Sequence, residues 1–126
     1  MRIKNVVIIG SGTMGSGIAA HLCNANIPVT LLDLKTEIAE KAKERILKSR
    51  PPLLFEQSKI NSLKIGNITD HFDTVSNADW IIEAVVERID IKHKIYDLIF
   101  KKRKKNSIVS SNTSTIPLKI LSEKLN

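Results

Sequence analysis

The chain is short, basic and contains one cysteine. It has 126 residues, 42% of them hydrophobic, and a formal net charge of +7 at pH 7. This length allows one domain and leaves no room for a separate substrate domain. No apolar run is long enough to span a bilayer and the N-terminus has no signal-peptide pattern, so we expect a cytoplasmic protein without membrane segments. The single cysteine, Cys23, excludes an internal disulfide and is expected to pack inside a helix.

A glycine-rich motif lies near the N-terminus. A β-branched run at residues 6–9 leads into Gly10, Gly12 and Gly15, which have the spacing G-x-G-x-x-G, and a helical pattern follows. Strand, turn and helix in this order are typical of a dinucleotide-binding βαβ unit. Gly10 would allow a tight turn, Gly12 a close approach of a pyrophosphate, and Gly15 the packing of the helix on the sheet. Glycine-rich turns of this kind also occur for structural reasons alone.

An acidic residue follows the glycines at the distance that the motif requires. The first helix is expected at residues 13–24, and phosphates would bind the free N–H groups at its start, where Thr13 and Met14 stand. A second strand at residues 29–32 ends at Asp33. A carboxylate there would accept hydrogen bonds from ribose hydroxyls and repel a 2′-phosphate, which favours NAD over NADP. Helix capping is the alternative role for Asp33.

The rest of the chain alternates between helical and strand patterns. Thr36 is expected to cap a helix that ends before Pro51, whereas residues 53–67 fit either a loosely attached helical excursion or a loop. The elements expected after it are a strand at 65–69, a helical turn at 73–77, a strand at 80–86, a helix at 90–104, a strand at 107–110 and a last helix from Pro117. This alternation predicts a Rossmann-type α/β fold, with a doubly wound, mostly parallel sheet of about five strands and flanking helices.

Charged residues are expected mainly on the solvent-facing sides of the helices. In the helix after Thr36, Arg45 is among the side chains expected to face water. In the later helix, Asp90 with Lys94 and Asp97 with Lys101 have the spacing of ion pairs. The three histidines are scattered in the sequence, and no spacing typical of a metal site occurs.

Five consecutive cations occupy residues 101–105. Such a run can form an anion-binding or nucleic-acid-binding patch. It can also close a helix, because cations complement the helix dipole and bind its terminal carbonyl groups. No aromatic residue is interleaved with the run, so we favour the helix-end interpretation and do not expect nucleic acid as a partner.

These motifs together resemble the NAD-binding domain of 3-hydroxyacyl-CoA dehydrogenases, which act in the third step of fatty-acid β-oxidation. The resemblance spans nearly the whole chain and rests on residues 10–19, Asp33, residues 83–92 and residues 111–115. The Ser-Asn-Thr-Ser sequence that begins at Ser111 looks specific to the hydroxyacyl-CoA enzymes. The resemblance implies an NAD-dependent oxidoreductase that converts 3-hydroxyacyl-CoA to 3-oxoacyl-CoA.

The resemblance also implies roles for individual residues. Glu87 and Lys92 would lie beside the ribose and nicotinamide half of the cofactor, and Asn112 would also belong to the cofactor site. Ser114 would contact both the nicotinamide and the 3-oxygen of the substrate, where its hydroxyl group can donate a hydrogen bond. For Ser114 alone, helix capping is an equally plausible role.

Other parts of such enzymes have no counterpart in this sequence. The resemblance places the catalytic histidine, in a His-Phe-Phe-Asn-Pro segment, its glutamate partner and a helical dimerisation domain beyond Asn126. We therefore expect an N-terminal domain expressed by itself or a naturally truncated relative, which is catalytically incomplete and meets its acyl-CoA substrate only with the missing part. A non-enzymatic NAD-binding module is the alternative function.

Overall fold

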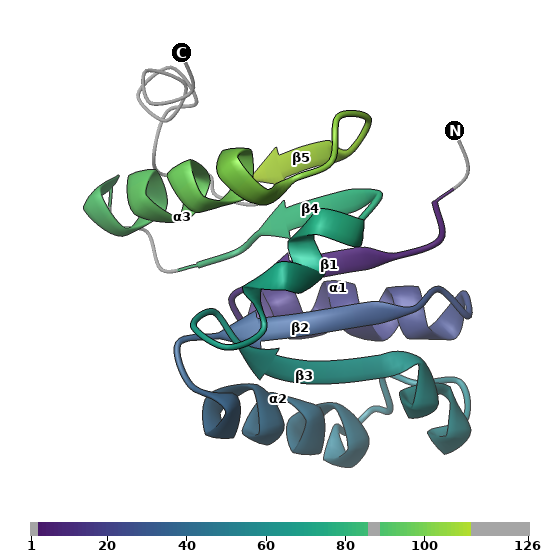
Figure 1. The fold of residues 1–126 in the computed structure, drawn as a ribbon. Coiled ribbons are helices and arrows are strands. Elements are labelled where there is room, and N and C mark those ends of the chain that lie inside the picture. The colour runs from purple at the N-terminus through teal and green to yellow at the C-terminus, as the bar shows by residue number, and fades with distance from the viewer. Residues whose placement is uncertain (1–2, 86–88, 112–126) are drawn as a thin grey trace.

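Five parallel strands form one sheet with the order β3-β2-β1-β4-β5 (Figure 1). The computed structural model describes residues 3–85 and 89–111, with the backbone alone at 89–92. The elements along the chain are β1 (Val6–Ile9), α1 (Thr13–Asn24), β2 (Val29–Asp33), α2 (Thr36–Lys48), η1 (Gln57–Ser62), β3 (Leu63–Asn67), η2 (Phe72–Asn77), β4 (Trp80–Glu83), α3 (Ile89–Lys102) and β5 (Ile108–Ser111). The predicted Rossmann-type fold is confirmed.

Two hydrophobic cores lie on opposite faces of the sheet. Successive side chains of a strand point to opposite faces, so Val6 and Ile8 pack with α1 and α2, whereas Val7 and Ile9 pack with η2 and α3. Figure 1 shows α1 behind the sheet and η2 in front of it. Cys23 is fully buried in the first core, where burial raises the pKa of its thiol, so its predicted packing role is confirmed.

The later elements begin and end close to their predicted residues. The fourth strand is shorter than expected, because β4 ends at Glu83, and α3 ends at Lys102. β3 begins at Leu63, two residues before the predicted strand, and pairs in register with β2 from Val29 onward. The last helix, predicted from Pro117, lies outside the described residues.

The ambiguous segment at residues 53–67 contains a loop, a short 3-10 helix and β3. Its loop is attached to α1, because Asn24 donates a hydrogen bond from Nδ2 to the carbonyl oxygen of Leu53 and accepts one at Oδ1 from the N–H of Phe55, both at 2.9 Å. Leu54 between them is buried in the first core. The loop alternative is therefore confirmed for residues 53–56, whereas a loosely attached helical excursion is not found there. Long-range contacts explain why local periodicity was ambiguous here.

The predicted capping role of Thr36 is wrong. Thr36 is already the first helical residue of α2, and the N-cap position is Lys35, which makes no side-chain capping hydrogen bond. The Thr36 hydroxyl oxygen instead accepts a hydrogen bond of 2.9 Å from Nδ2 of Asn67, at the end of β3. A contact between the start of α2 and the end of β3, 31 residues apart in sequence, has replaced the local cap.

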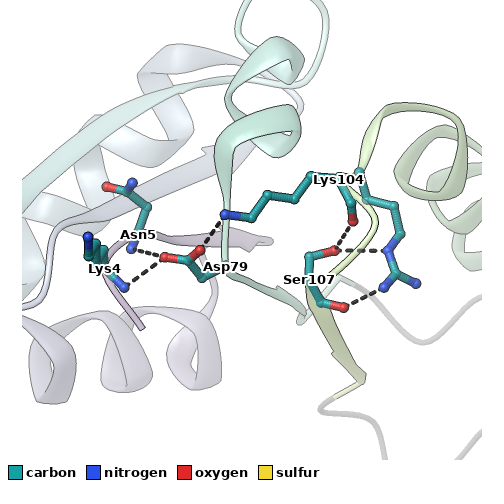
Figure 2. Close-up of polar contacts among 6 residues, drawn as sticks. Lys4, Asn5, Asp79, Lys104 and Ser107 are labelled. Atoms are coloured by element: carbon teal, nitrogen blue, oxygen red, sulfur yellow. Dashed lines mark hydrogen bonds and ion pairs between the residues drawn. The ribbon is translucent and has the colours of Figure 1, made fainter. Parts of the chain in front are cut away.

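At the amino edge of the sheet, a buried aspartate joins three segments (Figure 2). Asp79 Oδ2 accepts hydrogen bonds from the N–H groups of Lys4 at 2.7 Å and Asn5 at 3.0 Å, and Oδ1 forms an ion pair with Lys104. These contacts, led by the Lys104 hydrogen bond, lower the pKa of Asp79 to about 2. The carboxylate therefore connects the start of β1, the start of β4 and the turn after α3.

Several cations of residues 101–105 make contacts within the chain. Besides the Lys104 ion pair, Lys102 lies 3.5 Å from Asp73, and Arg103 donates hydrogen bonds to Ser107. These contacts favour the helix-end interpretation of the run. No ion pair joins Asp97 and Lys101 among the described side chains, so that prediction is wrong. An exposed pair gains little energy and loses side-chain entropy. The predicted pair of Asp90 with Lys94 lies outside the side chains that the structure describes.

Candidate dinucleotide-binding site

The glycine-rich loop follows β1 at the point where the strand order reverses. β2 and β3 lie on one side of β1, and β4 and β5 lie on the other. Gly10 has a φ of +108°, and a Cβ atom there would overlap the backbone of Ala84, just after β4. The Gly10 N–H donates to the carbonyl oxygen of Leu32 at 2.7 Å. Only glycine has the left-handed conformation without strain and allows the ends of β1 and β4 to lie so close.

The other two glycines of the motif have contrasting surroundings. A Cβ atom on Gly15 would overlap the carbonyl oxygen of Gly10, whereas a Cβ atom on Gly12 would have no atom within 4 Å. Gly15 therefore lets the first turn of α1 pack against the loop. Gly12 borders an open space that no described side chain or backbone atom fills, which is where the sequence predicts a pyrophosphate.

The N-terminus of α1 opens onto this space. Gly12 is the N-cap residue and makes no side-chain capping hydrogen bond, and the first turn contains no acidic residue. Thr13 and Met14 are exposed, the latter with 57% of its surface accessible. The first N–H groups of a helix have no intrahelical acceptor, and the helix dipole adds positive potential there. This end of α1 can therefore accept an anion.

Asp33, the last residue of β2, contacts the glycine-rich loop through Ser11. Its Oδ2 accepts hydrogen bonds from the Ser11 N–H at 2.8 Å and from the Ser11 hydroxyl group at 2.6 Å, while Oδ1 accepts from the N–H of Leu34 at 2.7 Å. The structure thus brings together the two parts of the motif that are separate in sequence. Sequence reasoning missed Ser11, although a hydroxyl residue between two glycines was visible.

Two further residues hold the carbonyl group of Ser11. The Ser16 hydroxyl donates to it at 2.9 Å, and Nη2 of Arg45 donates to it at 2.7 Å. Arg45 is exposed, as predicted, but its guanidinium group also contacts Ser11 in the glycine-rich loop and Ser16 in α1. Sequence reasoning did not predict these contacts.

These residues fit a dinucleotide. The open space at Gly12 and the free start of α1 suit a pyrophosphate. An ionised carboxylate has about four acceptor positions, and three protein donors bind Asp33, so about one remains for a ribose hydroxyl. Leu34 and Ile38, exposed to 61% and 40%, lie just after Asp33 in sequence and offer apolar surface for a planar base.

A fully buried carboxylate, that of Glu83, lies at the end of β4. Glu83 is fully buried and accepts hydrogen bonds from the N–H of Val85 at 2.8 Å, the hydroxyl of Ser111 at 2.8 Å and the hydroxyl of Tyr96 at 3.4 Å. Burial, with the nearby Glu83, raises the pKa of Tyr96 to about 12. Glu83 therefore connects the ends of β4 and β5. Sequence reasoning quoted Glu83 in a family segment but assigned it no role.

The residues predicted for the nicotinamide half lie mostly outside the described part of the structure. Glu87, Asn112 and Ser114 are not among the described residues, and only the backbone of Lys92 is described, in α3. Ser111, which directly precedes this segment, ends β5 next to β4. The roles of these four residues stay predictions.

No helix within residues 3–85 and 89–111 is long and apolar enough to cross a membrane. No group of three or more His, Cys, Asp and Glu side chains in the same ranges could hold a metal ion. The cytoplasmic location stays a prediction.

Comparison with known families agrees with this site. The model of the family described as 3-hydroxyacyl-CoA dehydrogenase, NAD binding domain, matches residues 5–126. The chain belongs to this family. Among curated relatives within it, a protein of Deinococcus radiodurans named a probable 3-hydroxyacyl-CoA dehydrogenase is 38% identical over 125 residues, and the match covers 94% of this chain and 36% of that protein. The resemblance found in the sequence is thereby confirmed.

Other relatives of this dehydrogenase family differ in name and organisation. The peroxisomal fatty acid beta-oxidation multifunctional protein AIM1 of Arabidopsis thaliana is 36% identical over 98% of this chain and 18% of its own length. The 5-formyl-3-hydroxy-2-methylpyridine 4-carboxylate 5-dehydrogenase of Mesorhizobium japonicum is 36% identical over 92% of this chain and 38% of its own length. The crystal structure of (S)-3-hydroxybutyryl-CoA dehydrogenase from Ralstonia eutropha has a TM-score of 0.79 and 28% identity, over 98% of this chain and 45% of that one. The chain thus spans less than half of each.

Proposed function

We propose that this chain is the NAD-binding part of a dehydrogenase that oxidises 3-hydroxyacyl-CoA to 3-oxoacyl-CoA in fatty-acid oxidation. The observation that carries the proposal is the open space at Gly12, bordered by the free start of α1 and joined through Ser11 to Asp33. Family membership and the names of the relatives support the substrate class.

In this proposal, the N–H groups at Gly12, Thr13 and Met14 bind the pyrophosphate, and the Asp33 carboxylate accepts a hydrogen bond from the adenosine ribose. NADP carries a phosphate on the ribose 2′-oxygen, which would bring a second anion against this carboxylate. Among the described residues, neither Lys35 nor Arg45 forms an ion pair with Asp33 that would neutralise its negative charge. The site therefore favours NAD.

The reaction itself needs the nicotinamide half of the site. Bound NAD supplies a hydride acceptor for the 3-carbon of the substrate. Ser114, by the family resemblance, donates a hydrogen bond to the substrate 3-oxygen and so fixes it near the nicotinamide. Glu83 supports this part of the proposal, because its carboxylate accepts a hydrogen bond from the Ser111 hydroxyl. This bond fixes the end of β5, the strand that precedes Ser114 in sequence.

The acyl-CoA substrate is a separate part of the proposal. The Mesorhizobium relative is named for a pyridine carboxylate substrate and shares this domain at 36% identity. An NAD-binding domain of this family therefore occurs with different substrates. A steady-state assay of the complete protein with NADH and acetoacetyl-CoA tests this part, and turnover of other carbonyl compounds without turnover of acyl-CoA would refute it.

The cofactor preference is tested by titration calorimetry. We expect NADH to bind at least about tenfold more tightly than NADPH, because like charges at close range are strongly unfavourable. Asp33→Asn should reduce this preference to near unity. Asp73→Asn removes the same charge from an exposed residue of η2 and should leave the preference unchanged. Equal affinities of the unmodified chain for both cofactors would exclude the role of Asp33.

A further inference from the structure

Every polar group of Ser11 forms at least one hydrogen bond with another residue of the chain. Its N–H and hydroxyl groups both donate to Asp33, at 2.8 and 2.6 Å. Its carbonyl oxygen accepts from the Ser16 hydroxyl at 2.9 Å and from Arg45 Nη2 at 2.7 Å. Ser11 is 1% exposed and lies between Gly10 and Gly12. A loop rich in glycine, which is otherwise the most flexible kind of backbone, is thus fixed at its middle residue.

The carbonyl of Ser11 and the N–H of Gly12 belong to the same peptide unit. A trans peptide is planar, and its C=O and N–H bonds point in opposite directions. Holding the carbonyl oxygen against Ser16 and Arg45 therefore turns the N–H of Gly12 away from α2. Gly12 is the residue that borders the open space.

We propose that Arg45 is a positioning residue for the dinucleotide: its guanidinium group fixes the Ser11–Gly12 peptide so that the Gly12 N–H is presented to the pyrophosphate. This inference rests on the proposed function. Arg45 acts through the loop and does not itself need to touch the cofactor.

The position of Arg45 in the fold suits this role. Asp33 ends β2 and Arg45 lies on α2, the next element, so one continuous segment holds Ser11 from both sides. Hydrogen bonds with a charged donor are stronger than those between neutral groups, so Arg45 is the stronger of the two donors to the Ser11 carbonyl. A second contact, of 3.4 Å, joins Arg45 Nη2 to the Ser16 hydroxyl. Arg45 is exposed overall, so its replacement leaves no buried cavity.

Titration calorimetry with NADH and with ADP-ribose tests the proposal on four proteins. Arg45→Met should weaken both ligands about three- to tenfold, since a hydrogen bond from a charged group orients the binding peptide. Arg45→Lys, which keeps a cationic donor, should restore part of the affinity. Lys41→Met is the matched control, because Lys41 is one turn earlier on α2, exposed, and carries the same charge. It should bind both ligands like the unmodified chain.

Two further measurements make each outcome decisive. Thermal unfolding of Arg45→Met should show a melting temperature close to that of Lys41→Met, and ¹⁵N relaxation should show a lower order parameter for the Gly12 amide only in Arg45→Met. Unchanged affinity in Arg45→Met, or an equal loss in Lys41→Met, would overturn the proposal. If the unmodified chain binds no NADH, the proposed function fails, and an unchanged Gly12 order parameter would then overturn the positioning role independently.

Discussion

At the scale of single residues, the three motif glycines meet three different environments. Gly10 has a positive φ and lies against Ala84, Gly15 lies against the Gly10 carbonyl, and Gly12 has open space beside it. Glycine therefore has a different role at each position. It allows an unusual backbone conformation at Gly10, close packing at Gly15 and the approach of a ligand at Gly12. Substitution by alanine separates these roles, because alanine adds one methyl group and little else.

Gly12→Ala should leave stability nearly unchanged and abolish tight NADH binding. The backbone at Gly12, with φ of −68° and ψ of −167°, is accessible to alanine, so we expect a change in unfolding free energy within about 0.5 kcal/mol. The new methyl group would occupy the space proposed for the pyrophosphate. Urea unfolding and NADH titration measure the two effects.

Gly15→Ala is the contrasting control for that experiment. Its methyl group would overlap the Gly10 carbonyl, so we expect a loss of more than about 2 kcal/mol in the free energy of unfolding. Equal stability of the two variants would contradict the assignment of separate roles, as would normal NADH affinity in Gly12→Ala.

At the scale of elements, the N-terminus of α1 is proposed to bind the cofactor, whereas a glycine inside the helix lowers its stability. Gly17 lies in its second turn, and a Cβ atom there would have nothing within 4 Å outside the helix backbone. Glycine is a poor helix former, so Gly17→Ala should stabilise the chain by up to about 1 kcal/mol. Urea unfolding measures the gain, and a loss of stability would show that the helix needs the smaller residue at this position.

The contacts at the starts of β1 and β4 depend on pH through Asp79. Its pKa is lowered to about 2 by hydrogen bonds from Lys104, Lys4 and Asn5. Because the native pKa is below the ordinary value of 3.8, this contribution to stability is present above about pH 4 and is lost as the pH falls toward 2. We expect Asp79→Asn to lower the midpoint of urea unfolding at pH 7. Between these pH values, the midpoint should fall less steeply in this variant than in the unmodified chain.

Asp73→Asn provides the comparison for the acid effect. Asp73 also pairs with a lysine, Lys102, but both side chains are well exposed, at 86% and 50%. Exposed pairs contribute little, so this variant should retain the decline of the urea midpoint with falling pH. An identical pH profile in Asp79→Asn and the unmodified chain would contradict the role of Asp79.

At the scale of the whole molecule, cofactor binding and turnover should separate. We expect the polypeptide of residues 1–126 to bind NADH without oxidising it in the presence of acetoacetyl-CoA. The family resemblance assigns proton transfer to a histidine outside these residues, and loss of a general base typically lowers the rate by about 10²- to 10⁴-fold. Absorbance at the NADH band measures turnover, with a complete 3-hydroxyacyl-CoA dehydrogenase as the positive control. Turnover that Ser114→Ala abolishes would show that a base lies within the chain.

Much of the fold could be read from local patterns. The β-branched run before Gly10 and the 3.6-residue periodicity of α1 and α2 each reflect a preference of a short segment, so these elements appear where they were predicted. The least clear segment, residues 53–67, was ambiguous because its order depends on contacts with Asn24 and on pairing with β2. Local propensity carries no information about such partners.

The sequence alone determined the α/β class, the family, the glycine spacing and the acid at the end of β2. Only the tertiary structure decided how those parts meet. Ser11 joins Asp33 across 22 residues and Arg45 across 34, and Asp79 joins Lys104 across 25. The reason is physical: the hydrophobic pattern and turn residues act within one element, whereas these hydrogen bonds exist only after the strand order β3-β2-β1-β4-β5 has placed distant segments side by side.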